Sequence, residues 1–190
     1  MRLLVVVLVV AASACVSSYV GSATPFAPAE LERDPGWIAV RNVPVIRQES
    51  QAECGAAAIA MVVSYWTTES SPRVFAALRP VSQPGLEAGR LRDFARQRHL
   101  RAYLVSGNVT DLERELQAGR PVLVGLVKPQ RSGALAHYEV VVGLHRDKGI
   151  IVTLDPAQGW RQNSLSGFLT EWKPAAYLTL VVVGRDNGPV

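Results

Sequence analysis

One almost wholly apolar stretch limits how this chain can fold. It follows Cys54 and has the sequence GAAAIAMVVSYW over residues 55–66. A helix of this composition has almost no polar face to turn toward solvent, so we expect a buried, central helix from near Cys54 to about Tyr65. Such a helix needs other elements around it, and 190 residues, 48% of them hydrophobic, are enough for one domain with a sizeable core.

Helix signals dominate the first half of the chain, and strand signals dominate the second. We expect further helices over 71–78, 86–97, 110–117 and 164–172. For the helix over 110–117, Thr110 and Glu113 predict a capping box and Gly119 a stop. Strands are expected over 37–46, 102–105, 121–127, 138–144, 150–154 and 176–183. Helices followed by an antiparallel sheet predict an α+β fold in a single domain.

The first 15 residues have the features of an export signal. Arg2 precedes an apolar run over 3–11, and small residues lead from there to Cys15. This ending fits a lipobox, in which Cys15 carries a lipid that anchors the mature protein to a membrane, and it also fits a plain A-x-A cleavage site. We expect the lipid-anchored form, placed in the periplasm or cell envelope. A tether over 16–36, the folded domain over 37–184 and a tail over 185–190 would follow the signal.

Charge and cysteine content narrow the function classes. The net charge is +4, and Lys and Arg are scattered without a basic block or interleaved aromatic residues, so no nucleic-acid partner is expected. The chain has two cysteines. Lipidation or signal cleavage removes Cys15 from pairing, so we expect Cys54 to be a free thiol. Cysteine and histidine do not cluster as zinc ligands do, so no metal or organic cofactor is expected.

Cys54 has two interpretations. A lone buried cysteine is most often a packing residue. However, Cys54 stands where the long helix is predicted to begin, and the positive end of a helix dipole favours a thiolate. Gly55 follows it, although glycine is a poor helix former, which indicates that something other than helix stability selects this residue. These features favour a nucleophile.

A nucleophilic thiol needs a base and a group that orients the base. Of the three histidines, His99 and His145 are expected on the surface, whereas His137 stands at the entrance to a strand. Asp155 ends the next strand, and a hairpin that turns near residue 146 places residues 137 and 155 side by side. Asp155 alone is also a common turn residue before proline.

Acyl transfer also needs hydrogen-bond donors for the developing oxyanion. The backbone N–H of Cys54 can supply one, because the first N–H groups of a helix have no partner within it. Gln48 and Gln51 both precede the thiol closely enough to supply another, or they are ordinary loop residues. Spacing alone does not choose between them.

These residues resemble a known family, the bacteriocin-processing or double-glycine leader cysteine peptidases. The resemblance lies in three motifs: QESQAECG over 48–55, HYEVV over 137–141 and DPAQG over 155–159. Phe168 and Trp172 stand where the family often has an aromatic pair, and the likeness covers about residues 43–183. The chain departs from the family in the Tyr65-Trp66 ending of its first helix and in lacking transporter domains, so we expect a stand-alone, exported form.

The resemblance implies a papain-like cysteine peptidase fold, with N-terminal helices packed on a C-terminal antiparallel sheet. It implies Cys54 as nucleophile, His137 as general base, Asp155 as orienting residue and Gln48, rather than Gln51, as oxyanion donor. No cofactor is implied. The substrate would be a peptide or protein, with a Gly-Gly type leader as one candidate, and the partner would be an export or fibre-assembly machinery.

Two other function classes remain open at this point. The domain could bind an extended peptide without cleaving it, as a chaperone or adaptor of a secretion system, or it could be a structural lipoprotein with an incidental thiol. All four positions of the implied site are retained, and this favours the enzyme.

Overall fold

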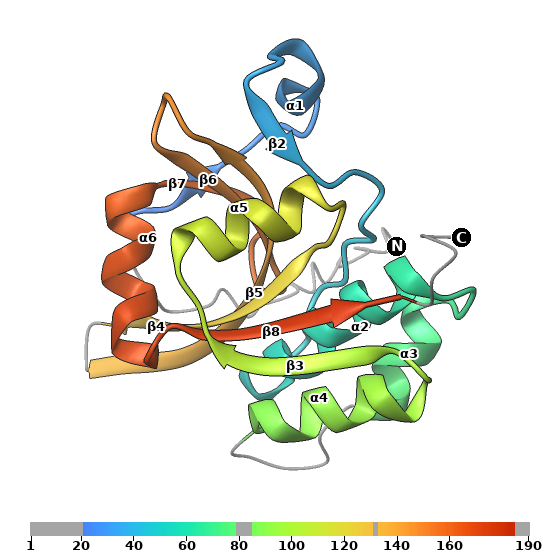
Figure 1. The fold of residues 1–190 in the computed structure, drawn as a ribbon. Helices are drawn as coiled ribbons and strands as arrows, with labels where there is room; N and C mark the ends of the chain where they lie inside the picture. Colours follow the sequence, from blue (N-terminus) through green and yellow to red (C-terminus); the bar gives the residue numbers. More distant parts are fainter. Residues whose placement is uncertain (1–20, 79–84, 131–132, 185–190) are drawn as a thin grey trace, which may run out of the picture.

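The computed structural model describes residues 21–78, 85–130 and 133–184. An eight-stranded antiparallel sheet has the order β1-β7-β6-β5-β4-β8-β3, with β2 paired to β5 off this path (Figure 1). The strands are β1 (Thr24–Pro25), β2 (Trp37–Ala39), β3 (Arg101–Ser106), β4 (Val122–Gln130), β5 (Gly133–His145), β6 (Ile150–Asp155), β7 (Gly159–Ser164) and β8 (Leu178–Val183). The helices are α1 (Glu30–Arg33), α2 (Cys54–Trp66), α3 (Ser71–Leu78), α4 (Ala88–Gln97), α5 (Val109–Gln117) and α6 (Leu165–Trp172), with 3-10 turns η1 (Gln51–Glu53) and η2 (Lys173–Ala175).

The long apolar helix lies at the centre of the molecule, as its composition predicts. α2 contacts β4, β5 and β8 on one side and α3 and α4 on the other (Figure 1). Its residues 54–63 are all buried. The α+β architecture is confirmed, with α2 and α4 packed against an antiparallel sheet and α3 packed on α2. No helix in the described ranges has the length and apolar character needed to cross a bilayer.

Several helices and strands begin or end at other residues than the sequence predicts. β2 stops at Ala39 instead of continuing to residue 46, and α4 begins at Ala88 instead of 86. The predicted cap of α5 is wrong. Asn108 and Asp111 form the capping box, each two residues before the expected Thr110 and Glu113. Asparagine is among the strongest N-cap residues, so the helix starts one residue earlier.

The strand β7 was not expected. Its sequence, GWRQNS, has no apolar alternation, and only two of its six residues, Gly159 and Asn163, are buried. β7 pairs with β6 and receives β1 on its outer side. The chain between β6 and β7 therefore turns within the DPAQG motif, and this turn fixes the end of the strand that carries Asp155.

Residues 21–36, the described part of the expected tether, pack on the rest of the domain. Phe26 and Leu31 are buried, and the Phe26 ring lies edge-on to Trp37. The carboxylate of Asp34 binds His145 Nε2 at 3.1 Å and the Lys148 ammonium. The expectation of an exposed His145 is wrong, since this contact and β2 cover it, whereas His99 is exposed as expected. The division of the chain into signal, tether, domain and tail stays a prediction, and Cys15 lies outside the described residues.

The hairpin of β5 and β6 forms at the predicted turn but in another register. His145 pairs with Ile150, and a bulge between Val141 and Gly143 brings Val140 opposite Leu154. Continued by one residue, this register places Asp155 opposite Glu139 rather than opposite His137. His137 and Glu139 are two residues apart and so share one face of the strand with Asp155.

Candidate active site

Cys54 is the first residue of α2, and the turn before it is firmly capped. Glu53 is buried, and its carboxylate accepts hydrogen bonds from the backbone N–H groups of Glu49 at 2.7 Å and Ser50 at 2.8 Å. Ser50 and Glu53 together form a capping box over η1. Sequence reasoning missed this role of Glu53, although the S-x-x-E spacing is its signal. The capped turn fixes the thiol at the positive end of the helix.

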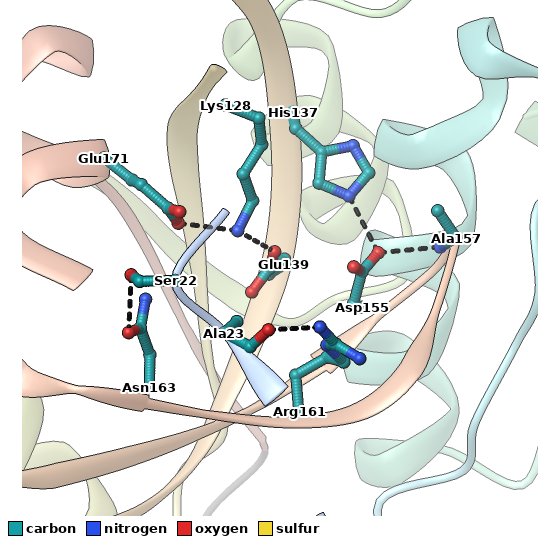
Figure 2. Close-up of polar contacts among 10 residues, drawn as sticks. All are labelled: Ser22, Ala23, Lys128, His137, Glu139, Asp155, Ala157, Arg161, Asn163 and Glu171. Carbon is teal, nitrogen blue, oxygen red and sulfur yellow. Dashed lines mark hydrogen bonds and ion pairs between the residues drawn. The ribbon is translucent and has the colours of Figure 1, made fainter. Parts of the chain in front are cut away.

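The structure brings Cys54, His137 and Asp155 together. The His137 side chain forms a hydrogen bond with the Cys54 side chain. On its other side, His137 Nε2 lies 2.9 Å from Asp155 Oδ1 (Figure 2). This leaves Nδ1 of the ring for the contact with Cys54. The exposed fractions of the three residues are 8%, 2% and 1%. Cys54 forms no disulfide within the described residues.

The charges in this group favour a protonated imidazole. Burial of the His137 ring disfavours its charged form, but hydrogen bonds and charge interactions with Asp155 and Cys54 outweigh it and raise the pKa of His137 to about 10. At neutral pH the ring is therefore an imidazolium beside the sulfur. The neighbouring phenol stays neutral, since burial and the charges of Cys54 and Glu87 raise the pKa of Tyr138 to about 12.

Asp155 both contacts His137 and forms the turn before proline, the two roles that the sequence suggested for it. Its Oδ1 accepts the hydrogen bond from the backbone N–H of Ala157 at 2.7 Å, which closes the turn after β6 (Figure 2). The same oxygen lies against His137 Nε2. The carbonyl of Pro156 in this turn accepts a hydrogen bond from the backbone N–H of Gln48 at 2.9 Å. The turn that holds the orienting carboxylate is thus tied to the segment that leads to the thiol.

The two glutamines before the thiol are placed differently. Gln51 is exposed in η1, whereas Gln48 is half-buried. The side-chain amide of Gln48 donates a hydrogen bond from Nε2 to the carbonyl of Ser50 at 3.0 Å. Its Oε1 is buried and has no hydrogen-bond partner among the described residues. Most buried side-chain polar atoms in folded proteins have a hydrogen-bond partner, so this oxygen is an exception.

Gly55 is explained by close packing at the helix start. A Cβ at this position would lie 3.2 Å from the Tyr138 ring and 3.5 Å from Leu86 Cβ. The backbone carbonyl of Ala52 would likewise lie 3.3 Å from a Cβ at Gly85, whose φ of +101° favours glycine in any case. Tyr138 and the 85–87 segment therefore form the walls beside Cys54, a role that the sequence did not reveal.

One group of described residues has the donor atoms of a metal site. His137, Glu139 and Asp155 each offer a ligand atom, and these atoms lie within 4.8 Å of one another. However, His137 Nε2 is bonded to Asp155, and Glu139 Oε1 lies 2.6 Å from the Lys128 ammonium. A cation would have to displace both contacts, so this donor set fits a charge network better than a metal.

Helices on one side, an antiparallel sheet on the other and a thiol at the start of the central helix, against a histidine from the sheet, are the arrangement of papain-like cysteine peptidases. The protein is a cysteine peptidase of this fold. The profile of the Peptidase C39 family matches residues 42–182, and the chain belongs to this family. The suspected double-glycine peptidase family is thereby confirmed. Among curated proteins, none matches the chain.

Solved structures of the family have the same fold. The peptidase domain of Streptococcus ComA, a bifunctional ABC transporter involved in quorum sensing, superposes with a TM-score of 0.61 at 21% identity over 76% of this chain and 100% of that domain. A double-glycine motif protease from an AMS/PCAT transporter, solved with its leader peptide, gives 0.60 at 23% identity over 77% and 94%. A C39-like peptidase from Bacillus anthracis gives 0.63 at 17% identity over 78% and 98%.

Proposed function

We propose that this chain hydrolyses a peptide bond through Cys54, His137 and Asp155, with Gln48 as a second oxyanion donor. The observation that carries the proposal is the continuous hydrogen-bonded series from the Cys54 thiol through His137 to Asp155, buried at the start of α2. The family supports a peptide substrate, and the leader-peptide complex of a related protease supports a Gly-Gly type leader as candidate.

The first half of the reaction uses the Cys54–His137 pair. His137 takes the proton of the Cys54 thiol, or holds it in a thiolate–imidazolium pair, and the sulfur attacks the carbonyl carbon of the scissile bond. The carbonyl oxygen becomes an oxyanion, which accepts hydrogen bonds from the Cys54 N–H and from Gln48 Nε2 once the amide leaves the Ser50 carbonyl. The C–N bond then breaks, His137 gives its proton to the leaving amine, and a thioester remains on Cys54.

The second half regenerates the enzyme. The neutral His137 takes a proton from a water molecule, and the resulting hydroxide attacks the thioester carbon. The same donors stabilise the second oxyanion. The carbon–sulfur bond breaks, the new C-terminal carboxylic acid leaves and releases its proton to solvent, and the thiolate–imidazolium pair is restored. Asp155 keeps Nε2 of the ring bonded in both halves, so that Nδ1 stays toward the sulfur.

The place of action that we propose is outside the cytoplasm. The pattern of residues 1–15 supports export, with a lipid on Cys15 that holds the protein at a membrane of the periplasm or cell envelope. A peptidase in this position would serve a secretion or surface-assembly system. Cys15→Ser is expected to move the protein from the membrane fraction to the soluble fraction. A wild-type protein without acyl modification, seen by mass spectrometry of its N-terminus, would contradict the anchor.

A comparison of protein termini in the native host tests the proposed reaction. Wild-type cells are expected to contain at least one new terminus that is absent when Cys54→Ala replaces the wild type. Alkylation with iodoacetamide provides a second measurement, in which wild-type Cys54 should react faster than free cysteine near neutral pH. An unreactive Cys54, together with unchanged termini, would contradict the peptidase and favour a peptide-binding module.

A further inference from the structure

A group of buried charges lies directly behind His137, and the proposed reaction leaves it unused. Lys128 on β4, Glu139 on β5 and Glu171 on α6 are exposed by only 1%, 2% and 4%. The Lys128 ammonium lies 2.6 Å from Glu139 Oε1 and 2.6 Å from Glu171 Oε2. Burying ions costs several kcal/mol each, and apolar replacements of such groups are often neutral or stabilising. Stability alone therefore does not explain this cluster.

Glu139 is the member of the cluster that reaches the proposed catalytic residues. It lies two residues from His137 on the same face of β5, and the register of the sheet brings it across from Asp155. A carboxylate oxygen of Glu139, one of Asp155 and a ring nitrogen of His137 lie within 4.8 Å of one another. Figure 2 shows the Glu139 carboxylate between Lys128 and the His137–Asp155 pair.

Lys128 lies within ion-pair distance of both carboxyl groups of this buried cluster. Burial disfavours the ammonium, but Glu139 and Glu171 outweigh it and raise the pKa of Lys128 to about 12. The pKa of Glu171 is raised, chiefly by burial, while Lys128 and the charge of His137 act in the opposite direction. The cluster therefore holds one ammonium for two carboxyl groups, and Glu139 is the carboxyl group that lies near His137.

We propose that Glu139 is a positioning residue that acts through His137: Lys128 holds its carboxylate beside the ring, where its charge stabilises the imidazolium and thereby the Cys54 thiolate. The inference rests on the proposed function of Cys54 and His137. The charged groups that face the ring come from four other elements, namely Cys54 on α2, Lys128 on β4, Asp155 on β6 and Glu171 on α6. Arg161 on β7 lies in the same region and donates to the carbonyl of Ala23 (Figure 2).

Titration of the His137 ring tests this role without a substrate. The chain has three histidines, so the ring signals of protein labelled with ¹⁵N-histidine can be assigned with His137→Ala. Glu139→Gln removes the charge but keeps the shape, and it is expected to lower the midpoint of the His137 titration by about one pH unit. Alkylation of Cys54 at neutral pH should slow several-fold in the same variant. Glu139→Asp keeps the charge and should stay closer to wild type in both measurements.

Glu171→Gln is the matched control, since it breaks the other ion pair of the same lysine, whereas Glu139 is the carboxylate grouped with His137 and Asp155. It is expected to shift the His137 midpoint less than Glu139→Gln does. If Glu139→Gln does not fold, the Lys128→Met/Glu139→Gln variant removes the pair as a neutral unit and should shift the midpoint in the same direction. A midpoint unchanged in Glu139→Gln, or an equal shift in Glu171→Gln, would overturn the inference. A wild-type His137 that is neutral at pH 7, beside an unreactive Cys54, would instead overturn the proposed function.

Discussion

Asp155 supplies both orientation and charge to His137, and substitutions can separate the two contributions. Its Oδ1 is shared between His137 Nε2 and the N–H of Ala157. Asp155→Asn keeps a hydrogen-bonding group of the same shape without the charge, whereas Asp155→Ala loses both. We expect the rate of Cys54 alkylation at neutral pH to fall about tenfold or more in Asp155→Ala and by less in Asp155→Asn. Equal rates in the two variants would show that orientation contributes nothing.

The raised pKa of His137 also predicts how folding stability depends on pH. A histidine whose pKa is about 10 in the folded state and 6.5 when unfolded contributes stability that is fully present below 6.5 and lost as pH rises through 10. The free energy of unfolding from this group should therefore decline between those values. Asp155→Ala should show a weaker decline over the same window, measured by urea unfolding at several pH values.

At the scale of single elements, the turn before α2 decides where the thiol lies. The buried Glu53 carboxylate accepts two backbone hydrogen bonds there. Glu53→Gln removes the charge that favours a helix start, and we expect a loss of about 1–2 kcal/mol in the free energy of unfolding. Cys54 should also be alkylated more slowly, since the helix start holds the sulfur. Chemical denaturation and the alkylation rate measure the two effects.

The capping box of α5 offers a matched control. Asp111 makes the corresponding hydrogen bond to the N–H of Asn108, but it belongs to a helix outside the proposed site. Asp111→Asn should lower stability while Cys54 reacts at the wild-type rate. A Glu53→Gln variant with unchanged alkylation would contradict a positioning role for the turn.

The elements also show what sequence could predict. α2 was predictable because a helix that is apolar on nearly all sides must be buried in the core. The β5–β6 turn was predictable because Arg-Asp-Lys-Gly is a strong hairpin signal. The register was not predictable, since a bulge at Val142 leaves no mark in a run of valines. His137 and Asp155 meet nevertheless, because their side chains span the offset on one face. Lys128, Glu139 and Glu171 come from three separate elements, and no local pattern links them.

At the scale of the whole molecule, the segment that leads into the domain belongs to its core. Phe26 is 6% exposed and packs against Trp37 and Trp160. Composition rich in Ser, Ala and Pro predicts a tether here, because a single aromatic residue carries little weight in such a pattern. Pairing with distant strands, which composition does not reveal, holds the segment in place. β1 pairs with β7, and Asp34 binds His145 of the β5–β6 hairpin.

A segment packed in this way should contribute to stability as a core element does. We expect Phe26→Ala to lower the free energy of unfolding by about 3 kcal/mol, because the side chain leaves a cavity beside two indole rings. Glu30→Ala, an exposed change in the same segment, should stay within about 0.5 kcal/mol of wild type. Urea unfolding of both variants measures the difference. A Phe26→Ala variant as stable as Glu30→Ala would show that the segment is a tether in solution, and the folded domain would then begin near Trp37.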